Sequence, residues 1–221
     1  MSNLSKRILT SLIIFPLSIF FIFKGGNLLL LFLFGVFVVA NYELFLVFNK
    51  KIMILCLDTV LILSLFSVYY LRESGEVSFK LLIWVIILCI CSDIGGYVFG
   101  KIFKWKKITE ISPNKTLSGV LGSFIFSLFS LFIVENVSFT SSAFIQFLEL
   151  KFFFLAIIFS LVAQIGDLTI SFFKRLEAVK DMGKILPGHG GIFDRIDGLM
   201  FVVILTFILY KFNFIYFPPP K

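Results

Sequence analysis

Seven long apolar runs, separated by short polar segments, make up most of this chain. Each run approaches the ~20 residues that an α-helix needs to cross the hydrocarbon core of a membrane. Hydropathy places them at residues 8–23, 28–48, 52–71, 81–100, 117–134, 152–170 and 198–216. The pattern predicts an all-α fold, a polytopic transmembrane helical bundle of about seven spans with polar loops between them.

Composition excludes a soluble globular domain. The 221 residues are 59% hydrophobic and 15% charged, and the mean hydropathy is +1.06. A soluble domain is roughly half apolar and a quarter charged. The first run is expected to be retained as a span, because no small-residue cleavage site follows it. Cys56, Cys89 and Cys91 all lie in apolar runs and support neither a disulfide framework nor a metal site.

The basic residues predict a topology. With the N-terminus in the cytoplasm, the inside segments carry fourteen of the twenty Lys and Arg residues, and the outside loops carry four. Cytoplasmic loops are enriched in Lys and Arg, so the long polar segments 101–116 and 171–197 are expected to be cytoplasmic polar loops. This bias accounts for the net charge of +7, which therefore does not indicate nucleic-acid binding.

An aspartate interrupts the fourth run near its predicted cytoplasmic end. Asp93 precedes Gly95 and Gly96, and such glycines indicate close helix packing or a break in the helix. Packing explains the glycines but not the aspartate. An acid within a span is a functional candidate by default, so we expect Asp93 to belong to a site.

The end of the sixth run carries a polar helical face. Gln164, Asp167, Ser171 and Lys174 are spaced by three and four residues, so they share one side of a helix. Such a face is expected to line a cavity or the protein interior. The alternative is a purely structural Asp167–Lys174 ion pair.

The last run begins with two acids on one face, Asp194 and Asp197. The structural interpretation is capping of a helix N-terminus. The functional interpretation places both acids beside Asp167. Magnesium would then be bound by these carboxylates together with phosphate oxygens of the substrate. Neighbouring Lys and Arg side chains would then bind phosphate. This combination favours phosphoryl chemistry with a metal.

Two further segments add candidates. His189, the single histidine, lies between glycines and is expected to contact a phosphate or act as an acid or base. A solvated loop residue is the alternative. Residues 112–116 supply hydroxyls and a lysine where the chain enters the membrane, although their Pro-Asn pair is also ordinary turn chemistry.

The polar insert 171–197 resembles the signature of the phosphatidate cytidylyltransferases, or CDP-diacylglycerol synthases. The matching residues are Ser171, Lys174, Arg175, Lys180, Asp181, Pro187, Gly188, His189, Gly190, Gly191, Asp194, Arg195 and Asp197. Upstream, Gln-Ile-Gly-Asp (164–167), Asp-Ile-Gly-Gly-Tyr (93–97) and Ser-Pro-Asn-Lys-Thr (112–116) are similar to further family motifs. The family usually carries Glu shortly after Lys-Thr, where this chain has Leu117, Ser118 and Gly119. The chain is also short for the family, by one or two N-terminal spans.

The resemblance implies a nucleotidyltransferase that moves CMP from CTP to phosphatidic acid, giving CDP-diacylglycerol and pyrophosphate. It implies Mg²⁺ bound by Asp167, Asp194 and Asp197, with room for a second, monovalent cation. The implied catalytic residues are Asp167, Ser171, Lys174, Arg175, Lys180, Asp181, His189, Asp194 and Asp197. The implied substrate-binding residues are Asp93, Ser112, Lys115, Thr116, Gly190, Gly191 and Arg195.

The resemblance also implies a setting for the enzyme. It predicts a homodimer in the lipid bilayer, in a bacterial inner membrane, with its active site facing the cytoplasm. Residues 1–80 would form N-terminal helices without a motif, and 81–221 a catalytic transmembrane domain.

Three alternative functions are compatible with parts of this pattern. A CTP-dependent polyprenol or phytol kinase would transfer the γ-phosphate to an alcohol and release CDP, and the full signature argues against it. A cation-coupled transporter would use the acids to bind ions, but the long basic loops do not suit one. An inactive relative is the third, and the intact acids oppose it.

Overall fold

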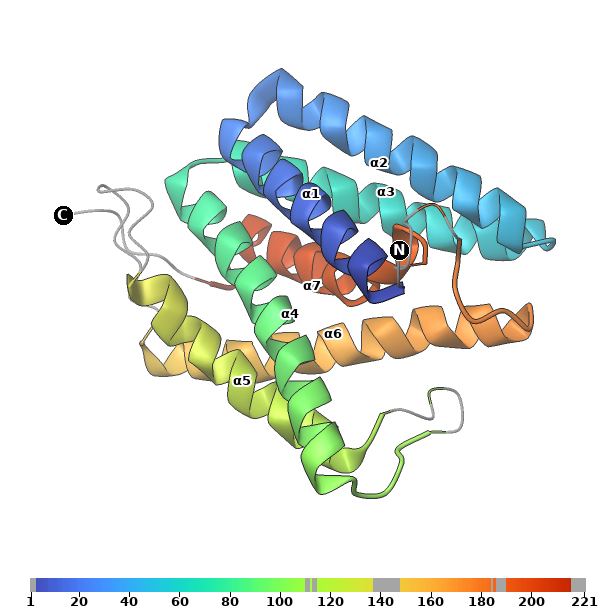
Figure 1. Ribbon diagram of the computed structural model, residues 1–221. Helices are drawn as coiled ribbons and strands as arrows, with labels where there is room; N and C mark the ends of the chain where they lie inside the picture. The colour runs from blue at the N-terminus through green and yellow to red at the C-terminus, as the bar shows by residue number, and fades with distance from the viewer. Residues whose placement is uncertain are drawn as a thin grey trace.

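The computed structural model describes residues 3–109, 112, 115–136, 148–183, 185 and 190–215, with side chains from Leu12 onward. Seven α-helices make up nearly all of this part of the chain. They are α1 (Asn3–Lys24), α2 (Gly26–Val47), α3 (Lys51–Glu73), α4 (Glu76–Phe103), α5 (Leu117–Asn136), α6 (Leu150–Leu176) and α7 (Phe193–Lys211) (Figure 1). The predicted all-α helical bundle is confirmed.

The helices match the predicted spans to within a few residues, except around the polar insert. The last helix before the insert, α6, runs on to Leu176, so that Ser171 and Lys174 are helical. After the insert, α7 starts early, at Phe193, and its first two turns include Asp194 and Asp197. The insert therefore begins and ends in helices, and its described residues between them, 177–183, 185 and 190–192, are not helical.

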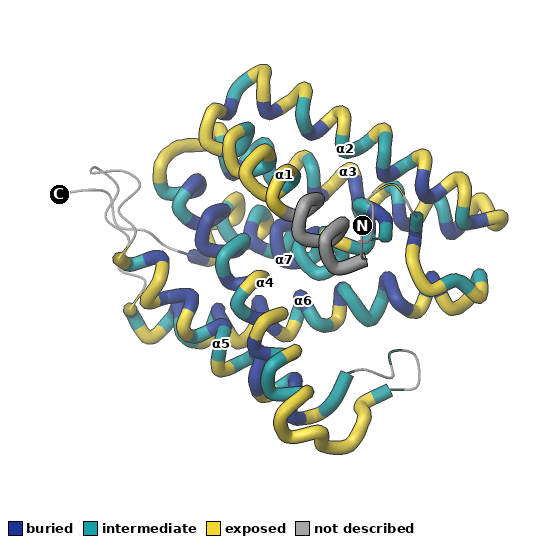
Figure 2. Tube along the Cα trace, viewed as in Figure 1, coloured by how far each residue is buried: buried dark blue, intermediate teal, exposed yellow. Residues whose placement is uncertain are grey.

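Length and hydropathy mark this chain as a multi-pass membrane protein. Of the described helices, α2 to α6 are long and apolar enough to cross a membrane, and α1 contains a shorter apolar stretch, Leu12–Lys24. Exposed positions lie along the outer helices of the bundle (Figure 2). Many of the exposed residues are large and apolar, with Leu31 69% and Phe45 68% exposed. Such surfaces are stable in contact with lipid and would be unusual in water.

The central helix is α7, which packs against α3, α4 and α6 (Figure 1). One group of buried apolar residues joins α4, α5, α6 and α7 around the fully buried Trp84. A second joins α2 and α3 to α6 and α7 around Leu44 and Phe193. Residues on both sides of position 80 therefore share buried cores.

The connections between helices form two groups, one at each end of the bundle. The α2–α3 turn, the α4–α5 loop and the segment 177–192 lie toward the right of Figure 1, whereas the α1–α2 and α3–α4 turns lie toward the left. This is the grouping that the predicted topology requires. At the left, Arg72 donates to the carbonyls of Ile22 and Phe23 at 2.6 and 2.7 Å, and Glu73 accepts the N–H of Gly26 at 2.8 Å.

The backbones of α4 and α5 are in direct contact. A Cβ atom on Gly95 would overlap the carbonyl oxygen of Gly122, and a Cβ on Gly122 would overlap that of Gly95. Close backbone approach of this kind is how small residues stabilise helix pairs within membranes. Because α4 is unbroken from Glu76 to Phe103, close packing is the role of Gly95 and Gly96 that the structure confirms.

Replacing Gly122 with Ala is expected to destabilise the protein. The added methyl group would force the two backbones apart, and overpacking of this kind costs about 1–3 kcal/mol. Gly35→Ala in α2 is the matched control, because a Cβ there meets nothing within 4 Å. The check is thermal unfolding of both variants in detergent. Equal stability of the two would contradict the backbone contact.

Candidate active site

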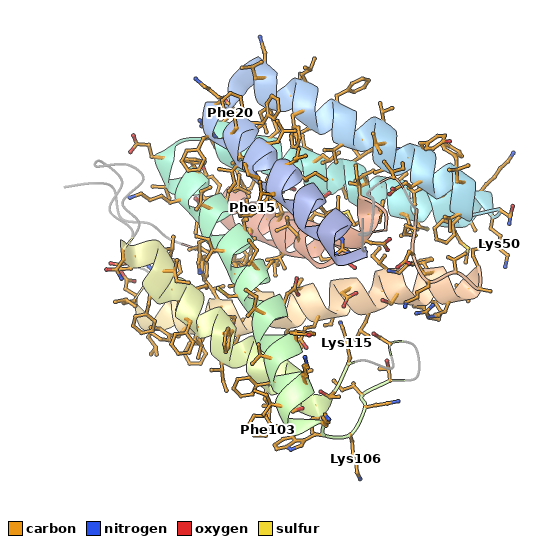
Figure 3. The ribbon with its side chains drawn as sticks, viewed as in Figure 1. Phe15, Phe20, Lys50, Phe103, Lys106 and Lys115 are labelled. Carbon is orange, nitrogen blue, oxygen red and sulfur yellow. The ribbon has the colours of Figure 1, made fainter. Side chains whose placement is uncertain are left out.

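The polar face of α6 meets a lysine from the α4–α5 loop. The Nζ of Lys115 lies 2.6 Å from Oδ2 of Asp167 and donates to the carbonyl of Gln164 at 3.1 Å. Figure 3 shows Lys115 directed from the loop toward α6, whereas Lys106 points away from the bundle. The hydroxyl of Ser171 donates to Oδ1 of Asp167 at 3.4 Å. Both oxygens of Asp167 therefore have a partner.

A buried ion pair joins α6 to α7. The Nζ of Lys174 lies 2.8 Å from Oδ1 of Asp194, and the two side chains are only 9% and 6% exposed. Oδ2 of Asp194 accepts the backbone N–H groups of Met182 and Gly191, at 2.8 and 3.0 Å. Lys174 thus pairs with Asp194 and not with Asp167. Besides Lys174, Asp194 binds two backbone amides of the segment that precedes α7, and its role as a metal ligand stays a prediction.

Two carboxyl groups come together where a metal was predicted. Asp167 and Asp197 lie within hydrogen-bonding range of each other, and Asp197 also accepts the N–H of Gly198 at 2.8 Å. Over the described residues, no three His, Cys, Asp or Glu side chains are grouped as a metal site. The structure therefore brings together two of the three predicted ligands, while Asp194 is engaged elsewhere.

The Asp167–Asp197 pair fits magnesium by its chemistry. Magnesium is usually held by one or two carboxylates, with waters and substrate phosphates completing its octahedral shell. The ammonium group of Lys115 already lies against Asp167 and a carbonyl oxygen, so positive charge is favoured at this place.

Two exposed residues extend this group of charges. Asp93 of α4 lies within electrostatic range of Asp167, Lys115 and Arg195, and both Asp93 and Arg195 are solvent-exposed. We call the five residues Asp93, Lys115, Asp167, Arg195 and Asp197 the central charge cluster. Three helices and one loop thus contribute to a single set of charges.

The remaining residues of the 112–116 motif shape the loop itself. The hydroxyl of Thr116 accepts the N–H of Gly119 at 3.1 Å, which caps the start of α5, and lies 3.0 Å from that of Ser118. The carbonyl of Ser112 accepts the N–H of Lys115 at 3.0 Å. Among the described residues of this motif, Lys115 makes the contact to α6. Ser118, in the stretch where the family usually has Glu, is buried.

Several predicted catalytic residues lie at the exposed edge of the insert. Arg175 donates to the carbonyl of Val179 at 2.8 Å and thereby closes the turn after α6. Arg175, Lys180 and Asp181 are solvent-exposed, so they are accessible to a soluble ligand.

The glycine-rich part of the insert is described only in part. Gly190 has a φ of 83°, a conformation that favours glycine, and a Cβ there would lie 2.9 Å from Oδ2 of Asp194. Gly191 is buried and donates its N–H to the same oxygen. His189 lies outside the described residues, so its role stays a prediction.

One residue beside the insert was not predicted. Glu43 of α2 is fully buried, and its carboxylate accepts the N–H groups of Ile192 and Phe193 at 3.1 and 3.2 Å. The sequence did hold a signal, because a charged residue within an apolar run is a functional candidate. Its partners, about 150 positions away along the chain, could not be read from spacing.

Replacing Lys174 with Met should destabilise the protein strongly, because it leaves the Asp194 charge buried without its cation. Breaking a buried pair from one side costs about 3–5 kcal/mol. Lys151→Met is the matched control, since the Lys151–Glu149 pair has a similar 2.7 Å distance but is 38% and 42% exposed, and exposed pairs contribute about 0–1 kcal/mol. Chemical unfolding in detergent measures both. A second replacement, Asp194→Asn, removes the charge and keeps an acceptor for the two amides, so it should restore much of the loss in the Lys174→Met protein. Equal losses in the Lys174→Met and Lys151→Met proteins would contradict this account.

The sequence of this chain is similar to those of known proteins from one family. The sequence model of the cytidylyltransferase family matches residues 46–213. The chain is 37% identical over 150 residues to a phosphatidate cytidylyltransferase of Helicobacter pylori strain J99, covering 67% of this chain and 52% of that relative. It is 39% identical over 142 residues to a protein of the same name from Staphylococcus saprophyticus, covering 63% and 52%. The corresponding Staphylococcus aureus strain COL protein is 37% identical over 156 residues, covering 70% and 57%.

The chain spans about half the length of the curated relatives that it matches. The matched region nevertheless extends over most of this chain, from the end of α2 to the end of α7, and it contains the whole polar insert. The chain therefore belongs to the cytidylyltransferase family.

Proposed function

We propose that this protein is a phosphatidate cytidylyltransferase, which transfers CMP from CTP to phosphatidic acid. The observation that carries the proposal is the central charge cluster, in which carboxylates and basic groups meet near the ends of membrane helices. The names of the curated relatives support the same activity. A site at such a position is accessible to a lipid from the bilayer and to a nucleotide from water.

The reaction requires a site that tolerates two anions. A phosphate oxygen of phosphatidic acid forms a bond to the α-phosphorus of CTP, and the bond from that phosphorus to the bridging oxygen breaks. Pyrophosphate leaves with the electron pair. Positioning and electrostatic stabilisation supply most of the catalysis in transfers of this kind. Lys115 and Arg195 would offset the repulsion between the reactants.

Asp167 and Asp197 are the residues proposed to hold magnesium. When bound, the ion would neutralise charge on the triphosphate and on the leaving pyrophosphate. Lys115, which contacts Asp167, would shift toward the phosphates as they enter. Asp194 would act indirectly, by keeping α7 in place. A second, monovalent cation is a further proposal from the family resemblance.

The other predicted contacts divide by position. Arg175, Lys180 and Asp181 lie at the exposed edge, where they would meet the nucleotide as it arrives. Ser171, beside Asp167, would contact a bound phosphate. We further propose a homodimer, a cytoplasmic active site and a bacterial inner membrane, all from the family resemblance and the distribution of basic residues.

Product analysis tests the reaction class. Purified protein given phosphatidic acid and CTP labelled on the α-phosphate is expected to place the label in the lipid and to release pyrophosphate. Label in the lipid from γ-labelled CTP, with release of CDP, would instead indicate a kinase. The absence of any CTP turnover, together with ion flux in liposomes, would indicate a transporter.

Asp197→Asn is expected to lower magnesium-dependent formation of CDP-diacylglycerol by about a hundredfold, because it removes one of two proposed metal ligands. The magnesium concentration for half-maximal activity should rise as well. Asp58→Asn is the matched control, since Asp58 is also an aspartate within a span and accepts a hydrogen bond from Asn41 at 3.0 Å. Near-normal activity and magnesium dependence of the Asp197→Asn protein would refute the metal assignment.

A further inference from the structure

We propose that Glu43 is a positioning residue of the active site: it holds the start of α7, and with it the charged residues of that helix, in the geometry needed for CTP. Glu43 lies on α2, three residues before the region that matches the family begins. It belongs to a helix otherwise expected to serve only as a membrane span. The kinetic test of this role rests on the proposed function, whereas the structural test depends only on the contacts of Glu43.

The carboxylate of Glu43 replaces a missing helix cap. Backbone N–H groups in the first turn of a helix have no partner within the helix. Ile192, the residue at the N-cap of α7, makes no side-chain hydrogen bond of the capping kind. Oε1 of Glu43 accepts the N–H of Ile192 and Oε2 accepts that of Phe193. Negative charge at this end also interacts favourably with the helix dipole.

Two glycines of the insert leave room for this side chain. A Cβ atom on Gly183 would lie 2.6 Å from Oε1 of Glu43, and one on Gly191 would lie 2.5 Å from Oε2. Both distances are shorter than van der Waals contact allows. The backbone of the insert therefore passes close to the Glu43 carboxylate at two places, Gly183 and Gly191.

Glu43 and Asp194 together satisfy three consecutive amides. Gly191 donates to Asp194, and the next two amides donate to Glu43. A phosphate therefore cannot bind these N–H groups while the two carboxylates are in place, so the role of Glu43 is positional. The residues that it positions are Arg195 and Asp197, which lie one turn further along α7.

The kinetic test compares Glu43→Ala with Glu73→Ala in the full chain in detergent micelles. Glu73 is the matched control, because it also accepts an N–H at a helix start from another helix, but at the opposite end of the bundle. We expect the KM for CTP to rise by about tenfold in Glu43→Ala, since two hydrogen bonds to a charged group are lost, and to stay unchanged in Glu73→Ala. Glu43→Gln should lie between, because one of its side-chain oxygens remains an acceptor. A purely structural role would lower Vmax through loss of folded protein and leave the KM unchanged.

Hydrogen–deuterium exchange supplies a test that does not depend on activity. The amides of residues 191–193 should exchange faster in Glu43→Ala than in the parent protein, and at the parent rate in Glu73→Ala. If Glu43→Ala fails to fold, Gly183→Ala can replace it, because its added methyl group displaces the Glu43 carboxylate without removing the charge. Amide exchange at residues 191–193 should again be faster, and the KM for CTP should again be higher.

The positioning role would be overturned if the amides of residues 191–193 exchange at the parent rate in Glu43→Ala. It would also be overturned if they exchange faster while the KM for CTP is unchanged. If the parent protein makes no CDP-diacylglycerol, the proposed function fails, and the exchange experiment still decides whether Glu43 holds α7.

Discussion

The buried pair between Lys174 and Asp194 is the interaction on which the geometry of the site depends. An ion pair with so little exposure is stable only when each charge is paired and its remaining hydrogen-bonding capacity is satisfied. Asp194 meets this condition with an ammonium group from α6 and two backbone amides from the insert. The pair therefore fixes α6, the insert and α7 relative to one another.

The carboxylates of this region illustrate a general constraint of membrane proteins. A charge removed from water must be compensated by the protein, or it is too costly to keep. Asp194 is compensated by Lys174 and two backbone amides, and Glu43 by two backbone amides. Asp167 and Asp197 lie close to each other, which is unfavourable for two negative charges without a cation or a shared proton. Asp167 and Asp197 are thus the pair of acids whose combined negative charge a bound cation would offset.

The sequence predicted the helices well and their contacts poorly, for a physical reason. Span prediction sums hydropathy over about twenty residues, so single polar residues hardly affect it. Spacing along a helix correctly placed Gln164, Asp167, Ser171 and Lys174 on one face. The same spacing suggested Asp167 as a partner for Lys174, whereas the ion pair forms across the insert with Asp194.

Contacts between distant segments were beyond the reach of the sequence pattern. Lys115 was expected to bind substrate, but its contact with Asp167 depends on how the α4–α5 loop folds back toward α6. Glu43 was missed because its partners lie at the start of another helix, and because the motifs that carried the family resemblance all lie after residue 92. A local pattern reports neighbours within one helix, whereas a site assembled from three helices and a loop can be identified only from the fold.

The bond between Glu43 and the start of α7 also has a consequence for biogenesis. Its two amide partners are synthesised 149 and 150 residues later, which at about 5–20 residues per second is a delay of roughly 7–30 seconds. During that interval α2 must reside at the membrane with a carboxylate that has no native acceptor site. Glu43 lies only one turn from the end of α2 at Val47, so its charge is able to reach the lipid headgroups. The contact between Glu43 and α7 can therefore form only after α7 has been synthesised.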